Sequence, residues 1–239
     1  MEKWEPISAD NYILVSKEHC FNTDTILLAN FSAPKKNYLC ADFGTGCGTI
    51  AFLWKIRQNP RQIFAIELQE KAYSQAKQSL ERNNFDNFNL INDNINNYKA
   101  VFTAGSLDLV ACNPPYKASG AGLKNPVENM RIARHEDELS LEDLAKAVSF
   151  SLKFGGKFCI CQRPERLTDC MDIFRKNGLE PKRLRLVQQR KDKKAFLFLL
   201  ECRRGGNSGL EILPTLFVEE NGEFSKEMLE IYGNYKTIN

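Results

Sequence analysis

Short runs of apolar residues alternate, from residue 38 onward, with segments whose apolar positions recur at helical spacing. Between 68 and 82, for example, Ala72, Ala76 and Leu80 fall on one face of a helix. The expected strands are 38–43, 62–67, 88–92, 107–112, 157–162, 183–189 and 195–202, and the expected helices are one ending near 57, then 68–82, 140–153, 165–176 and 225–232. This alternation favours a parallel sheet with helices on both faces.

The last two strands are joined only by the charged turn 190–194, which is too short for a crossover helix. We therefore expect this pair to be antiparallel. The whole pattern predicts an α/β fold, a doubly wound seven-stranded sheet with an antiparallel last strand. We expect one structural domain, with its core at 37–206, an N-terminal extension at 1–36 and a C-terminal extension at 207–239.

A glycine-rich loop, Asp42-Phe-Gly-Thr-Gly-Cys-Gly48, follows the first strand. Glycine lets the backbone turn tightly and approach a nucleotide, and the next helix offers backbone N–H groups. Glu67 ends the second strand, where a carboxylate can accept hydrogen bonds from both hydroxyls of a ribose. The spacing Gly-x-Gly-x-Gly differs from the Gly-x-Gly-x-x-Gly of dinucleotide sites, so we expect an adenosine-containing cofactor without a pyrophosphate.

A second motif, Asn113-Pro-Pro-Tyr116, ends the fourth strand. Ligands bind outside the carboxyl ends of the strands in an open α/β sheet, so this motif is expected beside the glycine loop. The Asn113 side-chain oxygen and the Pro114 carbonyl can accept the hydrogens of an amino group conjugated to a ring or carbonyl, which returns electron density to its nitrogen. Pro114 and Pro115 hold that carbonyl rigid, and Tyr116 offers a face on which an extruded base can stack.

Charge is divided unevenly along the chain, although the net charge is only +3. Residues 151–206 contain 15 Lys and Arg against 6 Asp and Glu, a local charge of +9, and the remaining residues carry 18 against 24, or −6. A basic region beside an acidic one favours a polyanionic partner that docks on one side. An ordinary solvated surface is the alternative interpretation.

The composition is that of an ordinary globular protein, with 239 residues of which 43% are hydrophobic and 26% charged. No run approaches the ~18–20 apolar residues of a membrane helix, and the N-terminus lacks the apolar core of a signal peptide, so we expect a cytoplasmic protein. The eight cysteines lie at 20, 40, 47, 112, 159, 161, 170 and 202, without a Cys-x-x-Cys pair. We expect buried free thiols rather than disulfides or a metal site.

The glycine loop and Asn-Pro-Pro-Tyr, in this order and spacing, resemble the class I S-adenosylmethionine-dependent methyltransferases, which act on exocyclic or amide nitrogens and have a Rossmann-like fold. The segments 21–29, 139–144, 153–158 and 203–206 resemble more narrowly the bacterial tRNA1(Val) adenine-37 N6-methyltransferases. The resemblance implies methyl transfer from S-adenosylmethionine to N6 of an unpaired adenine in a tRNA anticodon loop, with no metal and no obligate protein partner. Single-stranded loops are where a protein can splay out and stack a base, and we expect the tRNA on the basic 151–206 region.

The same resemblance assigns a role to each motif residue. The resemblance also implies that the N-terminal extension, residues 1–36, packs on the cofactor site. The cofactor loop would be shaped by Asp42, Gly44, Gly46 and Gly48, the ribose held by Glu67, the adenine amino group by Asp93, and the target amine oriented by Asn113 with Pro114, Pro115 and Tyr116.

Two positions depart from the family pattern. Asn94 stands where an apolar residue commonly packs on the adenine, which puts that contact in question. Phe154 stands where proline is usual, and we expect this change to affect only a turn.

Other functions share parts of the pattern. An N5-glutamine methyltransferase acting on release factors has Asn-Pro-Pro-Tyr but usually carries a helical domain before it, for which 36 residues are too few. An rRNA or DNA amino methyltransferase would use the same chemistry, although the DNA enzymes normally need a larger target-recognition domain. A dehydrogenase would explain the glycine loop and Glu67 but not 113–116. A non-catalytic RNA-binding protein would bind RNA equally well without Asn113.

Residues 117–138 begin with a glycine-rich stretch and carry several basic side chains. A segment of this length beside a catalytic motif is expected to be a mobile lid or a substrate contact. His135 lies within it, in a polar run, and is expected to be a surface histidine. The chemistry needs no general base, because the proton of the amine becomes acidic after methylation and can leave to water.

Overall fold

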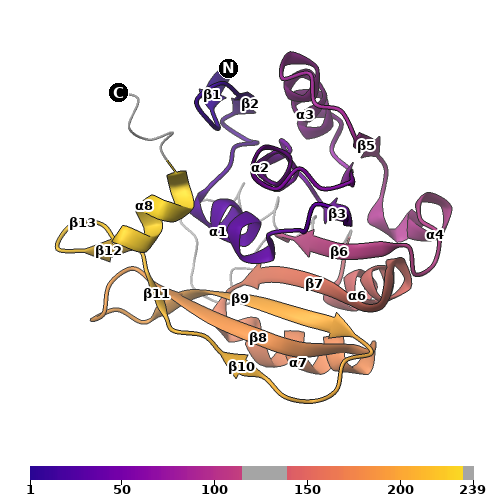
Figure 1. Cartoon of the computed structure of the whole chain (residues 1–239), viewed down its shortest axis with the longest axis vertical. Coiled ribbons are helices and arrows are strands. Elements are labelled where there is room, and N and C mark those ends of the chain that lie inside the picture. The colour runs from indigo at the N-terminus through magenta and orange to yellow at the C-terminus, as the bar shows by residue number, and fades with distance from the viewer. Residues whose placement is uncertain (115–138, 234–239) are drawn as a thin grey trace, which may run out of the picture.

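Seven strands, β3 to β9, form the centre of a mixed sheet in the computed structural model, which describes residues 1–114 and 139–233. Their bounds are β3 Leu39–Phe43, β4 Gln62–Glu67, β5 Phe88–Asn92, β6 Leu107–Cys112, β7 Leu152–Gln162, β8 Leu179–Gln188 and β9 Ala195–Arg204. The order across the sheet is β8-β9-β7-β6-β3-β4-β5, and only the pairs made by β9 are antiparallel (Figure 1). The predicted α/β fold with an antiparallel last strand is confirmed.

The sheet is wider than predicted. Two short strands, β10 Glu211–Ile212 and β11 Leu216–Phe217, pair in parallel with β8 and extend the sheet to nine strands. Each is two residues long, too short for the alternation by which a strand is detected in a sequence. They add an edge to the sheet and leave the order of the central strands unchanged.

The strand predicted at 157–162 is longer in the structure, and Gly155 and Gly156 lie within it rather than in a turn before it. β7 already begins at Leu152, and its pairing with β6 shifts register between Leu107 and Leu109. The extra residues form a bulge in which Gly155 has a φ of +78° and Phe154 is 80% exposed. Glycine in such a bulge allows the strand to continue across the irregularity.

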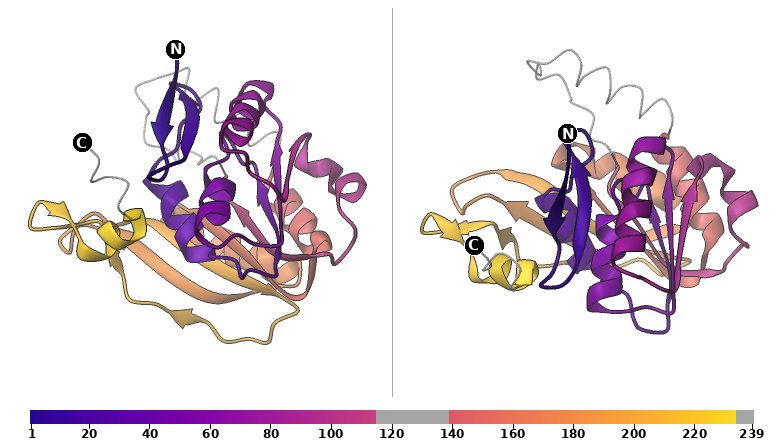
Figure 2. Two further views of the ribbon diagram at one scale, coloured as in Figure 1. Left: turned by 45° about the horizontal axis from the view of Figure 1, so that its top comes forward. Right: turned by 90° about the horizontal axis from the view of Figure 1, so that it is seen from above.

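Helices cover both faces of the sheet (Figures 1 and 2). One face carries α1 Thr23–Ser32, α2 Thr49–Arg57, α3 Glu70–Arg82 and α8 Lys226–Tyr232, and the other carries α4 Tyr98–Val101, α6 Leu141–Ser151 and α7 Leu167–Lys176, with the 3-10 turns Ile95–Asn97 and Pro164–Arg166. The side chains of β7 alternate between the two cores: Phe158 and Ile160 face one, Cys159 and Cys161 the other. This period of two is that of a strand buried on both sides.

Two hairpins lie outside the sheet, and the sequence pattern predicted neither. β1 Glu2–Pro6 and β2 Tyr12–Ser16 form the first. It is fastened to α3 because the Leu14 amide donates to Ser79 Oγ at 2.8 Å. The second consists of β12 Glu219–Glu220 and β13 Glu223–Phe224, next to α8. The division of the chain at 36 and 206 stays a prediction.

The cysteines follow the sequence expectation with one exception. All eight are free thiols and seven are buried, but Cys20 is exposed in the loop before α1. Within 1–114 and 139–233, no helix is long and apolar enough to cross a membrane.

Helix α1 is held against α2 by one buried polar contact. The indole Nε1 of Trp54, a fully buried residue of α2, donates to Ser32 Oγ at 3.0 Å. The Ser32 hydroxyl in turn donates to the Leu28 carbonyl at 2.7 Å. Since a buried indole N–H needs an acceptor, this bond secures the end of α1.

We predict that Ser32→Ala lowers the free energy of unfolding by about 1–3 kcal/mol, because it leaves the Trp54 N–H buried without its acceptor. Urea unfolding of the variant and of the wild type measures this difference. An unchanged midpoint at an unchanged slope would show that the contact does not fasten α1.

Candidate active site

The carboxyl ends of the parallel strands bring the two sequence motifs together. Phe43, the last residue of β3, pairs with Cys112, the last residue of β6. Gly44 and Asn113 are the next residues, so the glycine loop and the second motif leave the sheet side by side. Glu67 ends β4, the other neighbour of β3. The structure thus places Asn113, the loop and Glu67 at one edge, as the sequence led us to expect.

The glycine loop has a backbone conformation that other residues rarely adopt. Gly44, Gly46 and Gly48 have φ angles of +73°, +58° and +97°. A Cβ on Gly48 would lie 2.6 Å from the ring of Phe52, whereas a Cβ on Gly44 or Gly46 would meet no atom within 4 Å. Gly48 is therefore needed for packing, and the other two lie next to open space.

Glu67 holds this loop in shape. Its carboxylate is buried, with Oε2 accepting from the Gly46 amide and Oε1 from the Gln69 amide, both at 2.8 Å. The Gly44 and Thr45 amides both donate to the Ile66 carbonyl at 2.9 Å. A carboxylate has about four acceptor positions, so Glu67 can fasten the loop and accept hydrogen bonds from a ligand at the same time.

Asp42 is a buried carboxyl group beneath the loop. Its side chain is 1% exposed, and Oδ2 accepts from the Thr45 hydroxyl at 2.6 Å. Oδ1 has no hydrogen-bond partner among the described residues. Burial away from water raises the pKa of Asp42 to about 7, although the Thr45 hydroxyl and the Ala51 backbone amide act in the opposite direction. The Oδ1 atom can still accept a hydrogen bond from a donor nearby.

Asp93 follows the end of β5 at the same edge. Its Oδ1 accepts from the Asn94 amide and from Asn97 Nδ2, each at 2.7 Å. The Asn94 side chain caps the following 3-10 turn by accepting from the Asn96 amide at 2.8 Å. Asn94, the departure from the family pattern, therefore has a local structural role here.

Asn113 lies between α1 and β7. Its Nδ2 donates to Thr25 Oγ1 at 3.1 Å, and its Oδ1 accepts from the thiol of Cys161 at 3.1 Å. Neither Thr25 nor Cys161 is predicted from the sequence to lie at the site. The contact with Cys161 follows from the register, because Cys112 pairs with Ile160 and the next residues of both strands are neighbours. The contact with Thr25 depends on how α1 packs.

Several predicted features lie outside the described residues. Pro114, the last described residue before the gap, is half-buried and follows Asn113 in the chain. Pro115, Tyr116, the segment to 138 and His135 within it are not part of the described structure. Among the residues that are described, no group of three or more His, Cys, Asp or Glu side chains could hold a metal ion.

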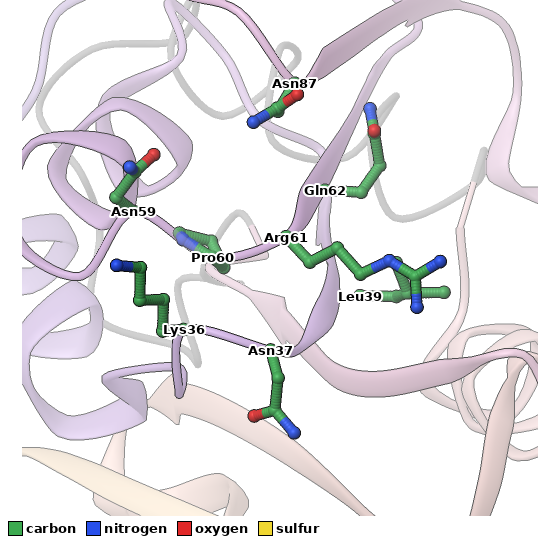
Figure 3. Close-up of a pocket in the computed structure, with 8 residues that line it drawn as sticks. All are labelled: Lys36, Asn37, Leu39, Asn59, Pro60, Arg61, Gln62 and Asn87. Atoms are coloured by element: carbon green, nitrogen blue, oxygen red, sulfur yellow. The ribbon is translucent and has the colours of Figure 1, made fainter.

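A separate depression lies at the opposite edge of the sheet. It has a volume of about 960 Å³, and its lining residues are Lys36, Asn37, Leu39, Asn59, Pro60, Arg61, Gln62 and Asn87. Figure 3 shows these side chains spread around an open space. Because Leu39 and Gln62 begin β3 and β4, this depression lies at the amino ends of the strands. It is separate from the site formed by the two motifs.

Comparison with known proteins identifies the family to which this chain belongs. Residues 14–140 match a family model described as the methyltransferase small domain. The chain belongs to the methyltransferase small domain family. A relative from Bacteroides fragilis (strain YCH46), named tRNA1(Val) (adenine(37)-N6)-methyltransferase, is 30% identical over 166 residues, which cover 69% of this chain and 69% of that protein. The sequence-based prediction of a methyltransferase is confirmed.

Solved methyltransferase structures share the fold. A predicted O-methyltransferase from Agrobacterium tumefaciens has a TM-score of 0.70 at 18% identity, and the match covers 88% of this chain and 95% of that one. TYW2 from M. jannaschii, solved in complex with AdoMet, has a TM-score of 0.57 at 14% identity over 85% of this chain and 86% of its own. These similarities confirm the Rossmann-like fold of a methyltransferase small domain.

We predict that Asp42→Asn stabilises the protein at neutral and alkaline pH. The folded-state pKa of about 7 lies above the ordinary value of 3.8. Between these values the unfolded chain releases a proton that the folded chain keeps, so the wild type loses stability as pH rises and the variant does not. The advantage of the variant should grow by up to about 1.4 kcal/mol per pH unit across that range and be constant above it.

Urea unfolding of both proteins at pH 4, 5.5, 7 and 8 measures this advantage. A difference that does not change with pH would show that Asp42 titrates at its ordinary pKa and is not the desolvated group that the structure describes.

Proposed function

We propose that the protein transfers a methyl group from S-adenosylmethionine to the exocyclic N6 of an adenine in tRNA. The observation that carries this proposal is the position of Asn113 next to the glycine loop, at the carboxyl edge of a methyltransferase sheet. The name of the Bacteroides fragilis relative supports the finer assignment to adenine 37 of tRNA1(Val). Such a substrate also implies a cytoplasmic protein.

The residues of the loop fit S-adenosylmethionine. Open space next to Gly44 and Gly46 leaves room for the cofactor against the backbone. Glu67 would accept hydrogen bonds from the ribose hydroxyls, and Asp93 from the adenine amino group. The Oδ1 atom of Asp42 would accept a hydrogen bond from the cofactor's methionine part. When bound, S-adenosylmethionine supplies an activated methyl group on a sulfonium.

Asn113 and Pro114 would act on the target amine. Both offer a carbonyl oxygen at the edge of the sheet, and accepting the two hydrogens of an exocyclic amine restores electron density to its nitrogen. Because residues 114 and 115 are both proline, the Pro114 carbonyl is held rigidly. Tyr116 would stack on the extruded base. Placement of this kind can lower the activation barrier by ~7–11 kcal/mol without a general base.

The basic 151–206 region is not one continuous cationic surface. At least ten of its fifteen Lys and Arg side chains make ion pairs, among them Arg163 with Asp24 and Arg185 with Glu227. The sum of +9 already subtracts the acids inside the region, but three of these basic residues pair with acids outside it, namely Asp24, Asp108 and Glu227, which reduces the charge available to a polyanion further. The charge available to tRNA is therefore concentrated at a few positions.

The turn 190–194 is one of these positions, because its four basic residues share a single acid, Asp192, which pairs with Arg190 and Lys193. Phe198 of β9 pairs with Gln162 at the end of β7, so the turn before β9 extends beyond the carboxyl edge, on the side of Asn113. Arg203 pairs with Lys157 at the other end of β9. A ten-residue strand is about 30 Å long, so Arg203 and Arg204 lie at the edge away from the site. The turn is the better candidate for phosphate contacts near the target base.

We predict opposite effects of two substitutions at the site. Asn113→Ala should abolish methyl transfer to tRNA and leave the affinity for S-adenosylmethionine almost unchanged, because the proposed role of Asn113 is to bind the target amine and not the cofactor. Glu67→Ala should weaken cofactor binding by about 1.5–3 kcal/mol for each charge-assisted bond that it removes. Calorimetry with the cofactor and methyl transfer from radiolabelled S-adenosylmethionine measure the two effects separately.

The same assay tests the function itself when total tRNA and total protein are offered as acceptors and the labelled nucleoside is identified. N6-methyladenosine in the RNA supports the proposal. Label in protein glutamine and none in RNA would assign the protein to the N5-glutamine methyltransferases instead. An Asn113→Ala protein with normal turnover would contradict the proposed role of this residue.

We also predict that replacing Lys191, Lys193 and Lys194 by Ala raises the KM for tRNA and leaves cofactor affinity unchanged. Removing the cation that binds one phosphate should reduce the slope of log affinity against log salt by about one. Kinetics with tRNA at several salt concentrations measure both quantities.

The matched control replaces Arg175, Lys176 and Arg203 by Ala, since these exposed residues lie at the opposite edge near the start of β8 and the end of β9. Its KM for tRNA should stay close to that of the wild type. An equal rise in KM in both triple variants would mean that tRNA binding depends on the total charge of the protein and not on the turn.

A further inference from the structure

An ordered chain of hydrogen bonds joins the first turn of α1 to Asn113. Asn22, which caps the helix, accepts at Oδ1 from the Thr25 amide at 3.0 Å and from the Thr25 hydroxyl at 2.9 Å. Thr25 Oγ1 accepts in turn from Asn113 Nδ2 at 3.1 Å. Asn22 and Asn113 lie 91 residues apart, so only the packing of α1 against the sheet creates this connection.

A backbone group sets the donor-to-acceptor direction of this series of hydrogen bonds. The Thr25 amide N–H is only a donor, so the atom of Asn22 that faces it must be the carboxamide oxygen. That oxygen can only accept, so the Thr25 hydroxyl gives its proton to Asn22. A hydroxyl whose proton is used in this way offers only lone pairs to its next neighbour. Thr25 therefore selects the NH2 end of the Asn113 carboxamide.

Contacts on the other side of Asn113 agree with this direction. Its oxygen lies 3.1 Å from the sulfur of Cys161, a fully buried thiol that can donate. In the reversed orientation the oxygen of Asn113 would face the lone pairs of Thr25, and two acceptors would oppose each other. The two ends of a carboxamide have nearly the same size, so hydrogen-bond partners, and not shape, decide which end points where.

We propose that Thr25 is a positioning residue for the methyl transfer: it holds the Asn113 carboxamide so that its oxygen, and not its NH2, is presented to the target amine. This inference rests on the proposed function, in which that oxygen accepts a hydrogen of the amine. In the reversed orientation the NH2 group of Asn113 would face the hydrogens of the target amine, and two donors would oppose each other. Without an acceptor for its hydrogens, the amine nitrogen would keep its lone pair delocalised. The helix cap at Asn22 thereby determines the orientation of a side chain in another layer of the fold.

Two further contacts keep α1 in the position that this role needs. Ser32, at the end of the helix, is bonded to the buried Trp54. Thr23, at its start, lies 3.0 Å from the hydroxyl of Tyr232 in α8. Figure 1 shows α8 beside α1. Because both ends of α1 are fastened, loss of the Thr25 hydroxyl alone should leave the helix in place.

The test is a set of variants at Thr25 in the full-length protein, with methyl transfer to tRNA measured as kcat and KM. Thr25→Val keeps the shape and removes the hydroxyl. We expect kcat to fall about tenfold or more, the equivalent of one hydrogen bond, with the KM for tRNA, the cofactor affinity and the unfolding midpoint close to those of the wild type. Thr25→Ser restores the hydroxyl and should restore kcat.

Thr23→Val is the matched control, because it removes a hydroxyl from the same helical turn that contacts Tyr232 and not Asn113. Because Ser32 and the Asn22 cap still hold α1, its kcat should fall far less than that of Thr25→Val. A purely structural role of Thr25 would lower the unfolding midpoint and spare kcat in the folded fraction. Normal kcat in Thr25→Val, or an equal loss in Thr25→Ser, would overturn the proposal.

A readout without turnover separates this inference from the proposed function. In the wild type and in Thr25→Ser, the side-chain amide protons of Asn113 should exchange with solvent more slowly, by NMR, than in Thr25→Val. If the wild type transfers no methyl group to tRNA, the proposed function is wrong, and the exchange rates alone decide whether Thr25 holds Asn113. Equal rates in all three proteins would refute the positioning role.

Discussion

The parallel register of β3, β4 and β6 is the constraint on which the site depends. It places the end of β3 between the ends of its two neighbours, so that residues from three distant parts of the chain leave the sheet at one edge. A slip of one residue would turn every side chain of a strand to the opposite face. The buried faces on both sides of the sheet prevent this slip, because each strand contributes alternate residues to two separate cores.

On that edge, the protein keeps groups that would be unfavourable elsewhere. The buried carboxyl of Asp42, with a pKa of about 7, costs stability because it is removed from water, and the glycines lose more conformational entropy on folding than other residues would. The Glu67 carboxylate offsets part of this cost by binding the Gly46 amide. The loop is thus shaped before any ligand arrives, which reduces the entropy lost on binding. Local conflict with the rules of stable packing is typical of a functional site.

Much of this architecture could be predicted from the sequence because its patterns are long and regular. The seven central strands, the antiparallel last pair and the meeting of the two motifs follow from periodicity, turn length and the edge rule for α/β sheets. β10 and β11 are too short to show a period, and the glycine pair at 155 and 156 fits a bulge as well as a turn.

Contacts between distant segments could not be predicted. The sum of charges over 151–206 could not show that Arg163 and Arg185 are paired with acids outside that region. Nor could the sequence place Thr25 against Asn113, since that contact depends on the angle at which α1 crosses the sheet. The roles of Asp42, Glu67, Asp93 and Asn113 rest on their positions and on the family, and stay predictions.

A crystal structure of the complex with S-adenosylmethionine tests the central claim most directly, namely that the glycine loop, Glu67 and Asn113 form one site. We expect the ribose hydroxyls on the Glu67 carboxylate, the methionine part over Gly44 and Gly46, and the sulfonium methyl directed toward Asn113 Oδ1. Cofactor bound at another edge of the sheet, or bound with Glu67 contacting only the Gly46 and Gln69 amides, would contradict it.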